Sequence, residues 1–341
     1  MGKNKKNATP GEENLHLPPH PFYSESTADA NVTSFTAIVD THTHLVSTFE
    51  SYVSAYPQAR YLTIHDFVRG FYTSEHPSKV EAIVDVWCEA PVTKTWKEIA
   101  DSALTEESRR DLWGGIEYWF VIDEVERDIL EAMTHPRCVG WGEMGLDYHY
   151  DNSPRQIQQD IFIRQLRHAV RLGKTLTIHT REAEEDSERI LKAEVPKDHK
   201  IHIHCYTDSP EWASRMLDHF PNLHIGITGV ITYTTNLTTS AVIRQMTFSS
   251  SASPTHPSPR ILLETDAPFM TPSNLYNTLP ALKNRRLPLS LTSMIPWTAE
   301  FVARVANEGR SAAPEETDSS PWDIEKVMRV ARQNAKTVYG V

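Results

Sequence analysis

Short runs of apolar and β-branched residues recur along the chain from about residue 36, and they predict β-strands. Polar stretches rich in turn-forming residues separate these runs. The pattern predicts eight strands, at residues 36–40, 81–87, 116–122, 138–144, 175–180, 201–206, 223–229 and 261–267.

Helical periodicity fills most of the intervals between the predicted strands. The clearest case is residues 156–172, where Ile157, Phe162, Leu166 and Ala169 lie on one helical stripe. Shorter helical patterns cover residues 124–133, 187–193, 212–219 and 240–247. Strands that alternate with helices eight times in one chain predict the α/β class and a TIM (β/α)8 barrel. A doubly wound open sheet is the structural alternative.

The domain organisation follows from where periodicity starts. Residues 1–34 hold Pro, Asn, Ser and Glu without periodicity, and we interpret them as a disordered or loosely attached arm. We expect one barrel domain over residues 35–341, with insertions at about 46–80 and 93–115. The aromatic residues of the first insertion could stack nucleic-acid bases. Alternatively, they pack as a small helical cap over the barrel mouth.

Composition narrows the class of protein. The chain has 341 residues, of which 39% are hydrophobic, so it can bury a sizeable core. Three cysteines are too few, and odd in number, for a disulfide framework, which favours a reducing compartment. No apolar run approaches the roughly 20 residues of a membrane helix. The polar N-terminus does not resemble a signal peptide, so we expect a cytoplasmic or nuclear protein.

The formal net charge is −11, the opposite of what a broad basic face for duplex nucleic acid would give. If the substrate is a polyanion, bound divalent cations must supply much of the local positive charge. The acidic balance therefore favours a metal-centred site.

Candidate metal ligands stand at the ends of several predicted strands. His42 and His44 are two residues apart, so in a strand both imidazoles point the same way. Imidazole and carboxylate groups also end four later strands, at Glu143, His179, His204 and Asp266. Any one of them could be a turn or cap residue, but in a barrel all six converge on the C-terminal rim. One metal rarely needs six protein ligands, so two metals bridged by a carboxylate would use the set better.

The sequence also resembles a known family in a series of ordered blocks. The blocks are DTHTHL, GWGEMGLDYHY, TIHTREA, HIHCYTDS, IGITGVIT, LLETDAPFMTP and RQNAKTVYG. They resemble the signature blocks of the TatD family of metal-dependent deoxyribonucleases, and the chain looks like a divergent, fungal-type member. The resemblance implies a TIM barrel of the metal-dependent hydrolase superfamily. It also implies a two-metal site and hydrolysis of DNA phosphodiesters, often as a 3′ exonuclease.

Carried over block by block, the resemblance assigns roles to individual residues. His42 and His44 would bind one divalent ion with Asp266, and His179 with His204 would bind the other. Glu143 would bridge the two ions, which could be Mg, Mn or Zn. The implied catalytic carboxylates are Glu264, Asp266 and Glu143, where Glu264 or Asp266 could take a proton from water. Arg181 is placed to bind substrate phosphate. Asp40, two residues before His42 on the same face, would orient a ligand imidazole.

Two departures from the family put the substrate in question. IEYWFVIDEVE stands where the family usually carries a Gly-x-His-Pro block after strand three. After strand six, Asp208 occupies a position where glycine is expected. His202, two residues before His204, is interpreted as a hydrogen-bonded core histidine rather than a ligand.

Three functional hypotheses remain open on the sequence. The favoured one is a metal-dependent DNase, with DNA as substrate and no membrane association. The second is another hydrolase of the amidohydrolase superfamily, but many of those use a lysine after strand four, where this chain has Glu143. The third is an interaction protein on a retained barrel, with a protein partner and weak or no nuclease activity. The oligomeric state cannot be predicted.

Overall fold

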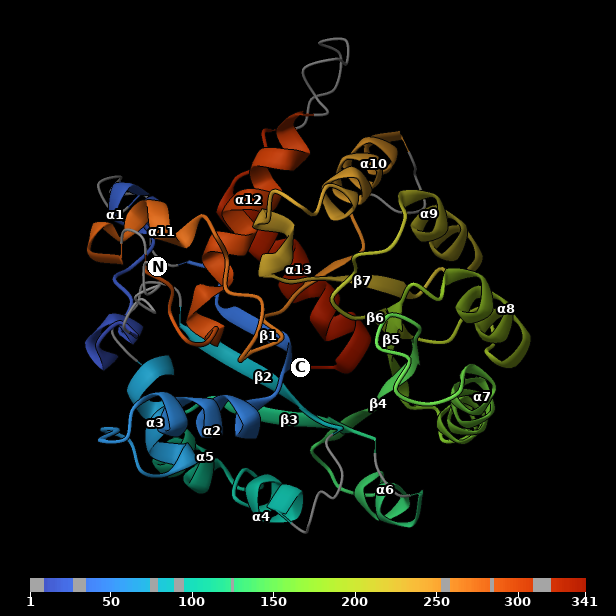
Figure 1. Ribbon diagram of the computed structural model, residues 1–341, viewed down its shortest axis with the longest axis horizontal. Coiled ribbons are helices and arrows are strands. Elements are labelled where there is room, and N and C mark those ends of the chain that lie inside the picture. The colour runs from blue at the N-terminus through green and yellow to red at the C-terminus, as the bar shows by residue number, and fades with distance from the viewer. Residues whose placement is uncertain are drawn as a thin grey trace, which may run out of the picture.

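Eight parallel strands form the centre of the molecule in the computed structural model, and each pairs with the next along the chain (Figure 1). The structure describes residues 9–26, 35–73, 79–88, 95–123, 126–252, 258–282, 285–308 and 320–341. The strands are β1 Ile38–Thr43, β2 Val80–Trp87, β3 Glu117–Ile122, β4 Cys138–Asp147, β5 Thr175–Arg181, β6 Ile201–Ile203, β7 Leu223–Ile227 and β8 Ile261–Leu263. The predicted TIM-barrel fold is confirmed.

Two backbone hydrogen bonds bring the end of β1 to the segment that follows β8. The Asp266 amide donates to the His42 carbonyl, and the His44 amide donates to the Ala267 carbonyl, both at 2.9 Å. These bonds nearly close the barrel. They also fix the two histidines of β1 next to Asp266.

Helices surround the strands in Figure 1. Those between the strands are α2 Leu45–Ala55, α3 Ile64–Tyr72, α4 Thr95–Asp101, α5 Glu106–Trp113, α6 Glu126–Ala132, α7 Arg155–Arg171, α8 Glu184–Glu194, α9 Pro210–His219, η2 Gly229–Thr232 and α10 Thr238–Ala252. After β8 come α11 Leu275–Thr278, η3 Pro280–Leu282, η4 Thr292–Met294, α12 Ile295–Glu308 and α13 Ile324–Tyr339. Among the described helices, none has the length and apolar content needed to cross a bilayer.

Local sequence explains where several helices begin and end. The Ser209 hydroxyl accepts the Trp212 amide at the start of α9, with Pro210 at the first helical position. The Asp323 carboxylate caps α13 in the same way, and Gly340 ends that helix with φ 79°. Caps of this kind satisfy backbone groups that have no partner inside the helix.

Residues 9–26 differ from the loosely attached arm that we expected. This segment contains η1 Glu12–Leu15 and α1 Pro21–Ser26. Leu15 and Tyr23 are buried, and Tyr52 of α2 hydrogen-bonds to Glu12. The expectation of a loose arm is therefore wrong for residues 9–26, and residues 1–8 and 27–34 lie outside the described part of the chain.

Several aromatic side chains of the first insertion pack in the core. Tyr52, Phe67 and Phe71 are buried, and the Tyr52 and Phe67 rings lie 5.2 Å apart between centroids. These rings are enclosed, so they cannot stack nucleic-acid bases. The helix α3 contacts both α2 and α5.

Candidate metal centre

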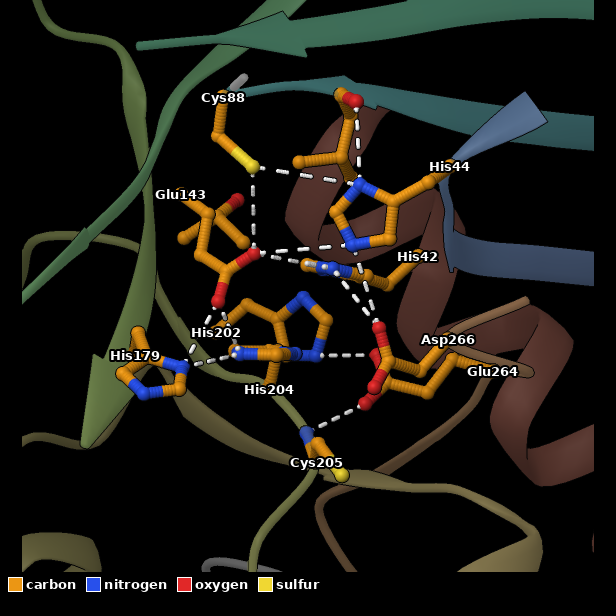
Figure 2. A network of polar contacts seen from close by, with 12 residues as sticks. His42, His44, Cys88, Glu143, His179, His202, His204, Cys205, Glu264 and Asp266 are labelled. Carbon is orange, nitrogen blue, oxygen red and sulfur yellow. Dashed lines mark hydrogen bonds and ion pairs between the residues drawn. The ribbon is translucent and has the colours of Figure 1, made fainter. Parts of the chain in front are cut away.

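The six side chains that sequence reasoning selected as ligands lie together at the C-terminal end of the barrel. Figure 2 shows the imidazoles of His42 and His204 between the carboxylates of Glu143 and Asp266. The two rings are stacked, with centroids 4.1 Å apart. The donor atoms of the six side chains form three overlapping groups. Within each group, every pair of donor atoms is within 4.8 Å.

The two carboxylate oxygens of Glu143 face different pairs of histidines. Oε1 lies 2.7 Å from His179 Nδ1 and 2.7 Å from His204 Nε2. Oε2 lies 3.5 Å from His42 Nε2 and 3.8 Å from His44 Nε2. One carboxylate thus connects two sets of nitrogen donors.

Asp266 completes the set around the histidines of β1. Its Oδ1 lies 3.7 Å from His42 Nε2 and 3.2 Å from His44 Nε2. Two ligands about 2.1 Å from one tetrahedral ion lie about 3.4 Å apart. The four distances from the Nε2 atoms of His42 and His44 to the oxygens of Glu143 and Asp266 are 3.2–3.8 Å, which is close to the separation of two ligands on one cation.

Unpartnered buried nitrogens support the same interpretation. Both ring nitrogens of His42, which is fully buried, have no hydrogen-bond partner among the described residues. Burying a polar group without a partner costs free energy, and native structures rarely leave one so. Because Nε2 points at two carboxylates at more than hydrogen-bonding distance, the residues present fit a cation at this position.

Groups outside the six orient two of the imidazoles. His179 Nε2 contacts Asp147 Oδ2 at 3.0 Å, which leaves Nδ1 facing Glu143. His44 Nδ1 lies 3.3 Å from the Val86 carbonyl, which leaves Nε2 facing Asp266. A metal-binding histidine ordinarily uses its second nitrogen in this way.

Sequence reasoning missed Asp147. It lies four residues after Glu143 on the same strand, so side-chain alternation puts both carboxylates on one face. That parity was the available signal, and the run GLDYHY placed Asp147 at the strand end.

Electrostatics at the cluster favour a positive charge. Burial lowers the pKa of His42 to about 4, so its imidazole is neutral and its nitrogens can act as ligands. Burial opposes ionisation of Glu143, but His204, His179 and His42 hold its pKa well below the usual range. Protons on neighbouring imidazoles neutralise the carboxylates here, and a bound cation would replace those protons.

Glu264 lies below the cluster and is fully enclosed. Its Oε1 accepts the Cys205 amide at 2.6 Å, and its Oε2 lies 2.8 Å from His202 Nε2. Burial raises its pKa to about 7. A Cβ at Gly226 would come within 2.4 Å of Glu264 Oε1, so glycine there leaves space for this pair. A base that takes a proton from water must be reached by water and substrate, whereas the Glu264 carboxylate is enclosed and contacts Cys205 and His202.

Two further predictions concern His202 and Asp40. His202 is fully buried and its Nδ1 lies 2.8 Å from the Tyr339 hydroxyl, which confirms it as a hydrogen-bonded core histidine. Asp40, which we expected to orient an imidazole, instead accepts the Thr265 amide and the Thr292 hydroxyl. It braces the backbone beside Asp266.

Arg181 lies outside the cluster. Its guanidinium carbon is 5.0 Å from the centroid of the Tyr150 ring. It stands on β5 two residues after His179, so the two side chains share a face of the strand. A cleft of about 410 Å³ reaches the cluster from solvent, and Glu143, Asp147 and His179 line it.

The fold and the site together define a (β/α)8 barrel with a candidate metal-binding donor set toward the carboxyl ends of its strands. Residues 39–340 match the family described as TatD related DNase. The chain therefore belongs to that family.

Two relatives and one solved structure illustrate the similarity. The chain is 34% identical over 250 residues to the human protein named 3′-5′ RNA nuclease TATDN2, covering 71% of this chain but only 30% of that protein. It is 35% identical over 223 residues to the Bacillus subtilis protein named uncharacterized metal-dependent hydrolase YabD. That match covers 64% of this chain and 73% of that protein. The crystal structure of YJJV, a TatD homologue from Escherichia coli, superposes with a TM-score of 0.62 at 16% identity. The superposition covers 90% of this chain and 99% of that chain.

Proposed function

We propose that this protein is a metal-dependent nuclease that hydrolyses phosphodiester bonds in DNA, acting as a 3′–5′ exodeoxyribonuclease with two divalent cations. The observation that carries the proposal is the placement of Glu143. Its two oxygens face two sets of histidines, as a carboxylate shared between two ions would.

The chain's own residues divide between the two ions. His42, His44 and Asp266 would hold one ion, and His179 with His204 would hold the other, with Glu143 between them. Bound divalent cations in such sites activate water and neutralise charge on phosphoryl oxygens. Because the chain carries a net charge of −11, this local positive charge is what makes binding of a polyanion feasible.

Individual side chains would also position the substrate and the attacking water. Asp266, which contacts His44 at 3.2 Å, is the carboxylate that we assign to accept a proton from water. Glu264 would support the site from below, because its carboxylate is enclosed. Arg181 would contact a substrate phosphate from the rim, with Tyr150 holding its guanidinium.

RNA is a second candidate substrate. The family description names DNA, whereas the relative TATDN2 is named as an RNA nuclease. Since the proposed contacts are to phosphate and cations, they do not by themselves distinguish the two sugars.

A labelled-oligonucleotide assay tests the proposal. A 5′-labelled single-stranded DNA should be shortened stepwise from its 3′ end when Mg²⁺, Mn²⁺ or Zn²⁺ is supplied, and a chelator should stop the reaction. The same sequence made as RNA measures the preference between sugars. Glu143→Ala and the isosteric Glu143→Gln should each lower the rate by at least about 100-fold, since both remove the shared carboxylate.

The matched control is Glu211→Gln, which changes an exposed carboxylate in the first turn of α9. It should cleave like the wild type. Circular dichroism should show that all variants are folded. If Glu143→Ala retains cleavage while folded, the assignment of this site to the reaction is wrong.

A further inference from the structure

A second cleft opens beside the cluster, and we call it the aromatic cleft. It has a volume of about 640 Å³, within the range of ligand-binding clefts, and its walls include Tyr233, Phe269 and Tyr276. The Phe269 amide donates to the Asp266 carbonyl at 2.9 Å. The loop that presents Asp266 to the cluster therefore also forms one wall of this cleft.

Phe269 presents an aromatic face to solvent inside this cleft. It is 55% exposed, whereas the rings of Tyr52, Phe67 and Phe71 are enclosed. The Tyr233 hydroxyl donates to the Thr271 carbonyl at 3.0 Å, which holds the opposite wall against the same loop. An exposed ring in a braced cleft is a suitable platform for stacking a flat ligand.

Arg286 gives the aromatic cleft a positive charge. Its guanidinium lies over the Tyr276 ring, with the carbon 4.2 Å from the ring centroid. Among the residues that the structure describes, no carboxylate pairs with Arg286, and none lines the aromatic cleft. A stacked guanidinium keeps its planar N–H donors available for an oxyanion.

The cleft on the other side of the cluster has the opposite character. Asp123, Glu143 and Asp147 line it. A strand of nucleic acid carries one negative charge per nucleotide. When cations occupy Glu143, Asp123 and Asp147 are the carboxylates of this cleft that would repel the body of the strand, whereas Arg286 would attract it. The charge distribution therefore selects the aromatic cleft for the part of the strand that is not being cleaved.

We propose that the aromatic cleft binds one nucleotide of a single-stranded nucleic acid, with its base stacked on Phe269 and its phosphate paired with Arg286. Only the identity of the ligand rests on the nuclease function proposed above. A base offers a flat π-face whatever its sequence, so binding here should tolerate all four bases.

Binding without cleavage tests the proposal directly. The probe is a fluorescein-labelled single-stranded octanucleotide with phosphorothioate linkages at its 3′ end, added to the metal-loaded protein and followed by anisotropy. Phe269→Ala should raise Kd about tenfold, and Phe269→Trp should restore it, because stacking needs an aromatic face. Arg286→Ala should also weaken binding and reduce the slope of log K against log salt by about 0.7.

Two controls separate stacking from a structural effect. Leu172→Ala and Arg171→Ala alter exposed side chains at the C-terminal end of α7, toward the opposite end of the barrel, and should leave Kd unchanged. A set of oligonucleotides that each lack the base at one position provides the second control. At one position, removal of the base should weaken binding to the wild type as much as Phe269→Ala weakens binding of the intact oligonucleotide. Removal of that base should not weaken binding to Phe269→Ala any further.

The outcomes distinguish this proposal from the nuclease function. If Phe269→Ala binds as tightly as the wild type, or if every abasic loss adds to it, the cleft assignment is overturned. If the pattern is as expected but the wild type cleaves no oligonucleotide, the cleft assignment stands and the nuclease proposal fails.

Discussion

At the residue scale, the site depends on side chains whose spacing along the sequence is informative by itself. His42 and His44 lie at the carboxyl end of β1, and strand ends in a barrel converge on one rim. Glu143 lies within β4, four residues before that strand ends at Asp147. The orienting contacts were less accessible to sequence reasoning. Asp147 on β4 contacts His179 on β5. Asp147 could therefore be identified as the partner of His179 only from the register of the two strands.

Asp208 is a residue whose burial leads to a prediction of pH-dependent stability. It is 9% exposed, and its Oδ2 has no hydrogen-bond partner among the described residues. Burial and the nearby Glu184 raise its pKa to about 7, from about 3.9 in an unfolded chain. The native state therefore holds this proton more tightly than the unfolded state, and the associated stability is lost as the pH rises through 7.

Asp208→Asn removes this titration. Relative to the wild type, the variant should gain about 1 to 3 kcal/mol of unfolding free energy between pH 5 and pH 8. Urea unfolding at both pH values, with chelator present so that metal binding does not contribute, measures the difference. An equal stability difference at the two pH values would show that Asp208 does not titrate in this range.

At the element scale, regular periodicity predicted the strands and most of the crossover helices. Residues 9–26 show why some elements could not be predicted. Their order depends on contacts with distant elements, such as the ring of His20 against Trp297 of α12, with centroids 4.9 Å apart. A short segment without periodicity gives no local signal of such contacts.

The helix α13 contributes a side chain to the interior of the barrel, and this leads to a prediction of stability. The Tyr339 hydroxyl lies 2.7 Å from Thr177 Oγ1 on β5 and 2.8 Å from His202 Nδ1 on β6. Tyr339→Phe would leave both buried groups without this partner, so unfolding free energy should fall by about 1 to 3 kcal/mol. Chemical denaturation measures the loss.

A double-mutant cycle with Thr177→Val provides the control. If the hydroxyl pair contributes as described, the two substitutions together should destabilise less than the sum of their separate effects. Strict additivity would show that the Tyr339 hydroxyl does not interact with Thr177. Cleavage activity should change little, because Tyr339 lies beneath Glu264 and His202 rather than among the six candidate ligands.

At the scale of the whole molecule, an acidic barrel concentrates imidazoles and carboxylates at one rim and places Arg286 in a cleft beside it. The barrel topology could be predicted because each strand is followed by its own crossover. The positions of the clefts could not, because they depend on the conformations of the loops after β7 and β8, and loops carry no periodic pattern of apolar residues. Together the rim and the aromatic cleft would supply the positive charge that a polyanionic substrate needs.

The metal content of the purified protein shows whether the six side chains hold two cations. After saturation with Mn²⁺ and removal of free ion, mass spectrometry should find about two ions per wild-type chain. His179→Ala should retain about one, because the set formed by His42, His44 and Asp266 is left intact. One ion or none in the wild type, or two ions in His179→Ala, would contradict the two-metal account.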